Sequence, residues 1–320
     1  MKHKLLMAIT AGTLALGGLA SQAEALTFRA PNGTTFNFNV FDDSPGNTVA
    51  LDAVPLVQQP ATQNFDLVYQ ATLGNFMQNS TVITANGGLN STYSISTVLG
   101  FTENGSITNA APPTNANFSF VPSNFNYFRM YLDPTPSQNI QTGMGFTPAT
   151  NPDLVLLMSG SITGSTGSFF VSSTNNAGPL DQSPNAINNL PGVTTVGGIG
   201  GTDLTAKILI TSINGAYFLD APGILTMDLA FNTVTQAPFR QVDPSKQVFV
   251  DGIGMYSPDY GAGNVNGIPN ADPTDPADFH FQSDSNASVV ITAVPEPSTM
   301  LLTGLGLAAL AGSVIRRKKS

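Results

Sequence analysis

The sequence predicts an all-β protein whose body is an antiparallel β-sandwich with a jelly-roll-like double sheet. Three observations predict this class. The 320 residues include 31 Gly and 23 Pro, which disrupt helices, together with many Ser, Thr and Asn, which compete with the helical backbone. Hydrophobic residues still make up 41% of the chain, so it is not a disordered polar chain. Finally, short extended runs alternate with turn sequences, and no helical period exceeds two turns.

About twelve short segments of the body have the pattern of strands. They are residues 36–40, 64–73, 91–99, 117–121, 125–132, 153–162, 168–171, 204–211, 225–233, 247–250, 279–282 and 287–291. The turn signals between strands are Asn32-Gly33, Asn104-Gly105, Asn214-Gly215 and Asp251-Gly252. Residues 154–158 are all apolar, which predicts a central strand that is buried on both of its faces. The polar stretches 102–116, 172–203 and 257–278 predict long loops.

The N-terminus has the three parts of a signal peptide. Two lysines lie in the first four residues, an apolar stretch follows over residues 5–20, and Ala23 and Ala25 hold the small-residue positions of an A-x-A cleavage signal. We therefore expect a signal helix over residues 1–25, cleavage by signal peptidase after Ala25, and export of the body.

The C-terminus combines an apolar run with a basic end. The run from Ser298 to Ile315 would span roughly 27 Å as a helix, close to the hydrocarbon thickness of a bilayer. Four cations follow it, and the positive-inside rule would keep them in the cytoplasm: Arg316, Arg317, Lys318 and Lys319. A permanent anchor, a buried core helix and a removable address tag all remain open on apolar length alone, although the four cations disfavour a core helix.

The residues before the apolar run favour the tag. Pro295 and Pro297 flank Glu296 and restrict the chain to an extended path that a processing enzyme can grip. Together, the P-E-P motif, the apolar segment and the basic tail of residues 294–320 resemble the PEP-CTERM sorting signal of Gram-negative bacteria. The resemblance implies exosortase as a partner, transient residence in the inner membrane, removal of the tail, and display of the body at the cell surface or in the extracellular matrix.

These signals predict three regions. Residues 1–25 form the signal peptide, residues 26–293 an all-β extracellular domain, and residues 294–320 the sorting signal with one transmembrane helix. Between residues 26 and 294, five cations stand against 18 acids, a net charge of −13. Such a body lacks the clustered cations that nucleic acid requires, so no nucleic-acid partner is expected.

The side chains that commonly carry catalysis are scarce. The chain has no Cys, which excludes disulfides and thiolate metal sites, and His280 is the one histidine after the predicted signal peptide. No nucleophile elbow, P-loop or dinucleotide motif occurs, so we expect no catalytic residue, no cofactor and no enzyme activity. Asp272, Asp275 and Asp278 are a weak calcium candidate, because hard oxygen ligands suit Ca²⁺, but the alternative is a solvated turn.

Two alternative functions remain open. A carbohydrate-binding module would have to use tyrosines, because there is no Trp, and Tyr256 and Tyr260 are the best exposed pair. A surface glycoside hydrolase needs two carboxylates at a suitable separation. The carboxylates considered for that role are Glu103, Asp66, Asp133, Asp153 and Asp228.

A second resemblance lies in the body. The segments that carry it are residues 65–71, 127–133, 145–146, 154–160, 232–245 and 278–284, which look like parts of flocculation-associated PEP-CTERM proteins. The resemblance implies a non-enzymatic role in cell aggregation, biofilm or exopolysaccharide association, with exopolysaccharide as a further partner.

Overall fold

The computed structural model describes residues 25–53, 61–107, 114–140, 142–173, 198–220, 225–235, 247–258 and 278–291, and every regular element in these ranges is a strand. The strands are β1 (Leu26–Arg29), β2 (Thr35–Phe38), β3 (Val40–Asp43), β4 (Gly46–Leu51), β5 (Ala61–Gln78), β6 (Thr81–Val82), β7 (Ser94–Ile107), β8 (Thr114–Asp133), β9 (Val155–Ser173), β10 (Gly198–Ile213), β11 (Leu225–Thr235), β12 (Val248–Val250), β13 (Gly254–Tyr256), β14 (Phe279–Ser283) and β15 (Ser285–Ile291). The all-β prediction is confirmed for these ranges.

Within the described ranges, no helix is long and apolar enough to cross a membrane. The predicted signal helix, except for Ala25, and the predicted span from Ser298 to Ile315 lie outside the residues that the structure describes.

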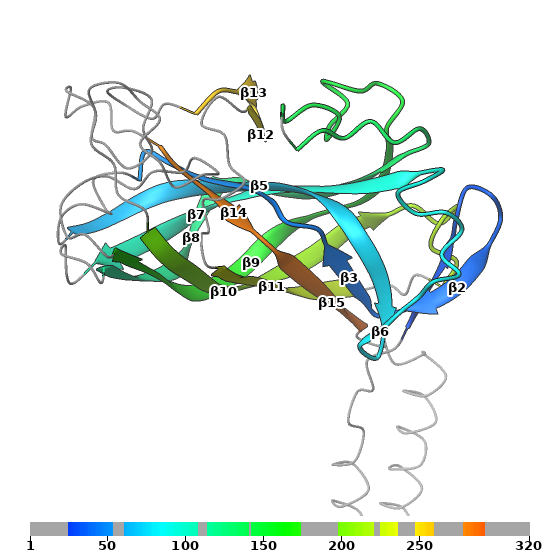
Figure 1. Cartoon of the computed structure of the whole chain (residues 1–320), viewed down its shortest axis with the longest axis horizontal. Coiled ribbons are helices and arrows are strands. Elements are labelled where there is room, and N and C mark those ends of the chain that lie inside the picture. The colour runs from blue at the N-terminus through cyan, green and yellow to red at the C-terminus, as the bar shows by residue number, and fades with distance from the viewer. Residues whose placement is uncertain are drawn as a thin grey trace, which may run out of the picture.

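The body is one closed antiparallel sheet, visible as a barrel in Figure 1. Two of its eight strand positions are interrupted strands: β3 and β4 are separated by Ser44 and Pro45, and β14 and β15 by Asp284. Around the barrel, the positions follow chain order from β3/β4 through β5, β7, β8, β9, β10 and β11 to β14/β15, which pairs with β3/β4 again.

The prediction of a jelly-roll-like sandwich is therefore wrong. Apart from the closing pair of β14/β15 with β3/β4, each strand position pairs with the positions before and after it along the chain, whereas a jelly roll places strands from distant parts of the chain side by side throughout. Alternating burial shows that one face of each strand is covered. It does not show whether a second sheet covers that face or the sheet curls round to cover it.

The strands are longer than predicted. β5, β7, β8 and β9 have 18, 14, 20 and 19 residues. The predicted loops 102–116 and 172–203 are wrong where β7, β8, β9 and β10 extend into them. Polar residues continue these strands because one face of each is turned away from the core. In β8, the pairing with β7 is interrupted between Val121 and Asn126, around Pro122, which has no N–H to donate.

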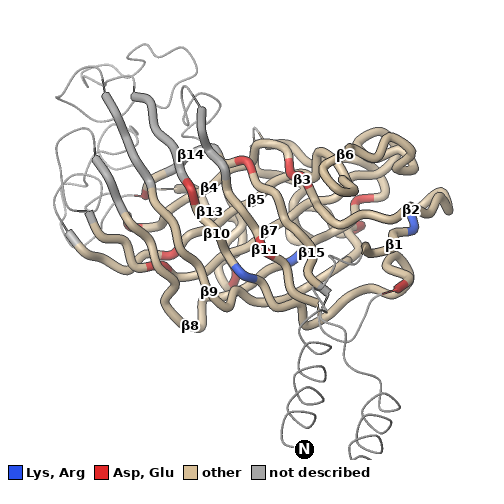
Figure 2. The backbone as a smooth tube through the Cα atoms, turned by 90° about the horizontal axis from the view of Figure 1, so that it is seen from below, with Lys and Arg blue, Asp and Glu red and all other residues tan. Residues whose placement is uncertain are grey.

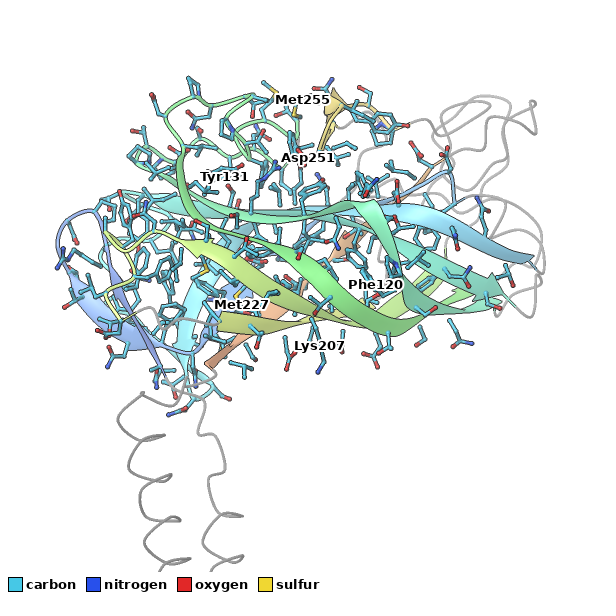
Figure 3. The ribbon with its side chains drawn as sticks, turned by 180° about the vertical axis from the view of Figure 1, so that it is seen from behind. Phe120, Tyr131, Lys207, Met227, Asp251 and Met255 are labelled. Atoms are coloured by element: carbon cyan, nitrogen blue, oxygen red, sulfur yellow. The ribbon has the colours of Figure 1, made fainter. Side chains whose placement is uncertain are left out.

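Apolar side chains fill the barrel interior. Every second residue of β10 from Leu204 to Ile210 is buried, whereas the residues between them are exposed. Figure 3 shows Met227 of β11 between the barrel walls and Lys207 of β10 pointing away from them. The alternation is the one expected when one face of a sheet packs on a core and the other faces water.

A second layer covers the outer face of β4, β5, β7 and β8. It consists of residues 134–140, residues 142–154 and the β12–β13 hairpin, which lie outside the wall in Figure 1. The buried residues of this layer and the wall beneath it are Val98, Tyr127, Tyr131, Phe146 and Leu154, and Val49, Val68, Val248 and Val250. The prediction that residues 154–158 are covered on both faces is wrong at Leu156, which is 41% exposed because the covering segment ends at Leu154.

An aromatic plug closes one end of the barrel. The plug consists of the β1–β2 hairpin and residues 214–220. Phe28 is fully buried, and its ring lies 5.1 to 6.3 Å from five other rings: Phe36, Phe76, Tyr93, Tyr217 and Phe218. β1 is held on both edges, by β2 and by hydrogen bonds from Arg29 N–H to the Tyr217 carbonyl and from Leu219 N–H to the Thr27 carbonyl.

Candidate functional site

Two buried carboxyl groups interrupt the apolar interior of the barrel. The first is Asp43, at the end of β3, beside the seam where β3/β4 meets β14/β15. Ser285 Oγ donates to Asp43 Oδ2 at 2.8 Å, and Thr97 Oγ1 donates to Oδ1 at 3.3 Å. The Tyr69 hydroxyl lies 2.9 Å from Ser285 Oγ and 3.4 Å from Asp43 Oδ2. The hydroxyls of Tyr69, Thr97 and Ser285 therefore join β5, β7 and β15 to β3 through one carboxyl group.

The second buried carboxyl group is Glu103 on β7, only 1% exposed, which accepts a hydrogen bond from Ser165 Oγ at 2.7 Å. Burial raises the pKa of Glu103 to about 7, and the hydrogen bond from Ser165 opposes the rise. Burial likewise raises the pKa of Asp43 to about 7, against the lowering effect of the Ser285 and Thr97 hydroxyls. Both groups are therefore protonated far more readily than exposed carboxyl groups.

The two carboxyl groups do not form a pair. Thr97, which contacts Asp43, lies six residues before Glu103 on β7, a separation of about 20 Å along the strand. Retaining and inverting glycosidases hold their two carboxyl groups within roughly 5 to 10 Å. These two groups therefore lack the spacing of a hydrolase site.

The other carboxylates considered for hydrolysis are dispersed. Asp66 lies opposite Thr102 and bonds to its hydroxyl on the outer face of the sheet, whereas the neighbouring position Glu103 is inward. Asp133 is buried but holds the following loop, since it accepts bonds from the Thr135 and Ser137 N–H groups. Asp153 is exposed and Asp228 half-buried on β11. Asn151 links Asp133 and Asp153, because its amide N–H donates to Asp133 Oδ2 and its Oδ1 accepts the Asp153 backbone N–H, but the Asp153 side chain is turned to solvent.

The calcium candidate is described only at Asp278. This residue is 1% exposed and accepts bonds from the Asp52 N–H at 2.8 Å and the Tyr256 hydroxyl at 2.6 Å, so it secures the β12–β13 hairpin. Asp272 and Asp275 lie outside the described residues. Where the structure is described, no group of three or more His, Asp or Glu side chains could hold a metal ion.

Among the described residues, no aromatic side chain offers an exposed platform for sugar rings. Tyr256 is half-buried and bonded to Asp278, and Tyr260 lies outside the described residues. None of the described aromatic side chains is exposed. The backbone of His280 pairs with Val49, while its side chain is not among those described; Phe279 beside it packs in the core.

The charges of the barrel are sparse and scattered, as Figure 2 shows. The Arg129 guanidinium donates two hydrogen bonds to the Asp251 carboxylate, of 3.0 and 2.8 Å. Its Cζ atom lies 5.4 Å from the centre of the Tyr127 ring. In Figure 3, Tyr131 and Asp251 lie together at the second layer, whereas Phe120 lies at the barrel. This ion pair holds the β12–β13 hairpin on the wall and marks no ligand site.

The uncovered outer wall carries rows of hydroxyl and amide side chains that sequence reasoning missed. Ser119, Thr166 and Thr205 are cross-strand neighbours on β8, β9 and β10, and all three are exposed. In the next row, Asn117 and Ser168 continue the pattern of amide and hydroxyl groups, and the third position is the carboxylate Asp203. The sequence does show polar residues at every second position of β8, β9 and β10. Their alignment into rows depends on the register of the three strands, which the sequence does not give.

The two ends of the described body lie at the plug. β1 starts at Leu26, whose side chain is fully buried, and β15 ends at Ile291. Of the predicted processing residues, Ala25 is described, whereas Ala23, Pro295, Glu296, Pro297 and the basic tail Arg316 to Lys319 lie outside the described residues.

Comparison with family models finds a PEP-CTERM protein-sorting motif at residues 293–318. The match contains the P-E-P sequence, the whole apolar run and three of the four terminal cations. The resemblance of the C-terminus to this signal is therefore confirmed. Comparisons with curated proteins and with solved structures find no match to the chain.

Proposed function

We propose that this chain is an exported, non-enzymatic protein that exosortase sorts to the surface or extracellular matrix of a Gram-negative bacterium. The observation that carries the proposal is the match of residues 293–318 to the PEP-CTERM protein-sorting motif. The signal-peptide pattern of residues 1–25 supports it, because a protein sorted at the membrane must first be exported. In this proposal the apolar run holds the chain in the inner membrane only until the tail is removed.

A variant of the sorting motif tests the proposal. Changing Pro295→Ala, Glu296→Ala and Pro297→Ala together removes the two prolines that keep the chain extended and the carboxylate between them. The apolar run stays intact. We expect the variant to stay in the membrane fraction with its tail, while the wild-type body reaches the surface. Ser298→Ala with Thr299→Ala is the matched control and should behave as wild type. Unchanged surface display of the triple variant would argue against exosortase sorting.

The body is proposed to associate with neutral polysaccharide of the matrix and so to support cell aggregation. The exposed rows of Ser119, Thr166 and Thr205, and of Asn117 and Ser168, favour this role, because hydroxyl and amide groups exchange hydrogen bonds with sugars without a charge requirement. The buried positions and wide separation of Asp43 and Glu103 support a non-enzymatic role.

Loss of one hydroxyl row tests the matrix role. Ser119→Ala, Thr166→Ala and Thr205→Ala in one chain should weaken binding of the surface-collected protein to isolated matrix polysaccharide and reduce cell aggregation. Thr35→Ala, Thr62→Ala and Thr81→Ala remove three exposed hydroxyls elsewhere and serve as the control. Equal binding by both triple variants would count against this face as the matrix contact.

A further inference from the structure

The structure brings the two ends of the body to one place. Leu26 pairs with Phe38, and the carbonyl of the next residue, Asn39, accepts the Val289 N–H at 2.9 Å. Ile291 lies two residues beyond Val289. Figure 1 shows β2, β6 and the tip of β15 together at this end of the barrel. We call it the plug end.

Little chain separates these ends from the segments expected to enter the membrane. The predicted signal peptide ends at Ala25, directly before β1. From Ile291, Pro295 is four residues away, at most about 14 Å, and the apolar run starts at Ser298, at most about 25 Å away even for a fully extended chain. An inserted apolar run therefore holds the plug end, and not the opposite end, close to the bilayer.

The plug end also suits a membrane surface chemically. The charged residues of β1, β2, residues 77–83 and residues 214–220 are Arg29 and Asp220, which cancel, whereas the chain between residues 26 and 294 has a net charge of −13. Val82 and Leu219 are exposed there, at 43% and 37%. A neutral and partly apolar end is the part of an acidic body that anionic headgroups repel least.

We propose that the plug end is the membrane-facing surface of this protein and lies against lipid headgroups until the tail is removed. The inference rests on the proposed export and sorting, and it adds which surface of the barrel meets the bilayer. The opposite end, where β5 begins and β7 ends, then points away from the membrane, about 50 Å further along β5.

The absence of Cys makes this orientation testable by single-cysteine labelling. Thr81→Cys places a fluorophore at the plug end and Thr62→Cys at the far end of β5, and both threonines are exposed. Each labelled full-length chain is reconstituted in vesicles of zwitterionic and anionic phospholipids that carry a nitroxide-labelled lipid. Circular dichroism and thermal melting confirm that both variants keep the wild-type fold.

We expect loss of fluorescence at Thr81→Cys and emission at Thr62→Cys close to that in nitroxide-free vesicles. Equal quenching at both positions, or stronger quenching at Thr62→Cys, would overturn the orientation while leaving export and sorting intact. Failure of the full-length chain to associate with the vesicles at all would overturn the orientation together with the membrane-held intermediate of the proposed function.

Discussion

At the scale of single residues, the barrel contains two groups that water would normally keep charged. Asp43 and Glu103 are buried with hydroxyl partners and have pKa values near 7. Asp43 receives bonds from Ser285 and Thr97, which stand on strands far apart in the chain. A polar contact, and not packing alone, therefore joins β3 to β15 at the seam of the barrel. The free energy of this contact depends on whether Asp43 is protonated.

The stability of the protein should fall as the pH rises from about 4 to about 7. In this window the folded state keeps protons on Asp43 and Glu103 that the unfolded chain has already released, so raising the pH favours unfolding. Each group contributes a loss on the order of 3–4 kcal/mol, which is complete once the pH has passed the folded-state pKa of about 7. Urea unfolding of the full chain at a series of pH values measures the effect.

Two neutral variants isolate these contributions. Asp43→Asn and Glu103→Gln should each make the stability depend less steeply on pH between 4 and 7, whereas Thr62→Ala, which removes an exposed hydroxyl and no carboxyl group, should not. If the pH profile of Asp43→Asn matched that of the wild type, the buried carboxyl at the seam would not be a titrating group in this window.

Sequence reasoning treated Glu103 as a loop residue because Gly and Asn surround it. Asn104-Gly105 has the composition of a hairpin turn, yet both residues lie within β7. They pair with β5 on one side and β8 on the other. Asn32-Gly33 and Asp251-Gly252 do form turns, with positive φ at both glycines, and they connect the short hairpins β1–β2 and β12–β13.

At the scale of elements, the plug surrounds the short strand β1 with aromatic rings. β1 has only four residues, so it cannot hold its place by ladder hydrogen bonds alone. Phe28 anchors it among five rings, and Leu26 beside it is fully buried. β1 was not predicted as a strand, because four residues beside a predicted signal peptide give too short an alternating pattern.

Phe28→Ala should destabilise the protein by about 3–5 kcal/mol, because it leaves a ring-sized cavity in a fully buried cluster. Urea unfolding followed by circular dichroism measures the loss. Phe36→Ala is the matched control: its ring is only partly buried in the same cluster, so the loss should be clearly smaller. Equal losses would mean that Phe28 is not the anchor of the plug.

Most of the longer strands were predicted as strand segments, but the sequence did not show that two such segments join into one strand. The predicted segments 117–121 and 125–132 both belong to β8, and 153–162 and 168–171 both belong to β9. Pro122 does interrupt the pairing of β8, so the division there has a physical cause. Gly164 and Gly167 suggest a turn within β9, but pairing with β10 extends through both.

At the scale of the whole molecule, the alternation of apolar and polar residues along the strands could not predict that the sheet closes. Strand periodicity gives the buried face of each element, but closure depends on the pairing of β15 with β3, which are more than two hundred residues apart. Closure removes free edges from the barrel wall, which suits a protein that is to be displayed outside the cell without aggregating through strand addition. It also brings Leu26 and Ile291 to one end.

If signal peptidase and exosortase process the chain at its two ends, the body alone remains outside the cell. Intact-mass spectrometry of the protein collected from the cell surface measures this. We predict a chain that begins at Leu26 and has lost the apolar run together with Arg316, Arg317, Lys318 and Lys319. A surface protein that still carries these four cations would show that processing does not occur and that the apolar run is a permanent anchor.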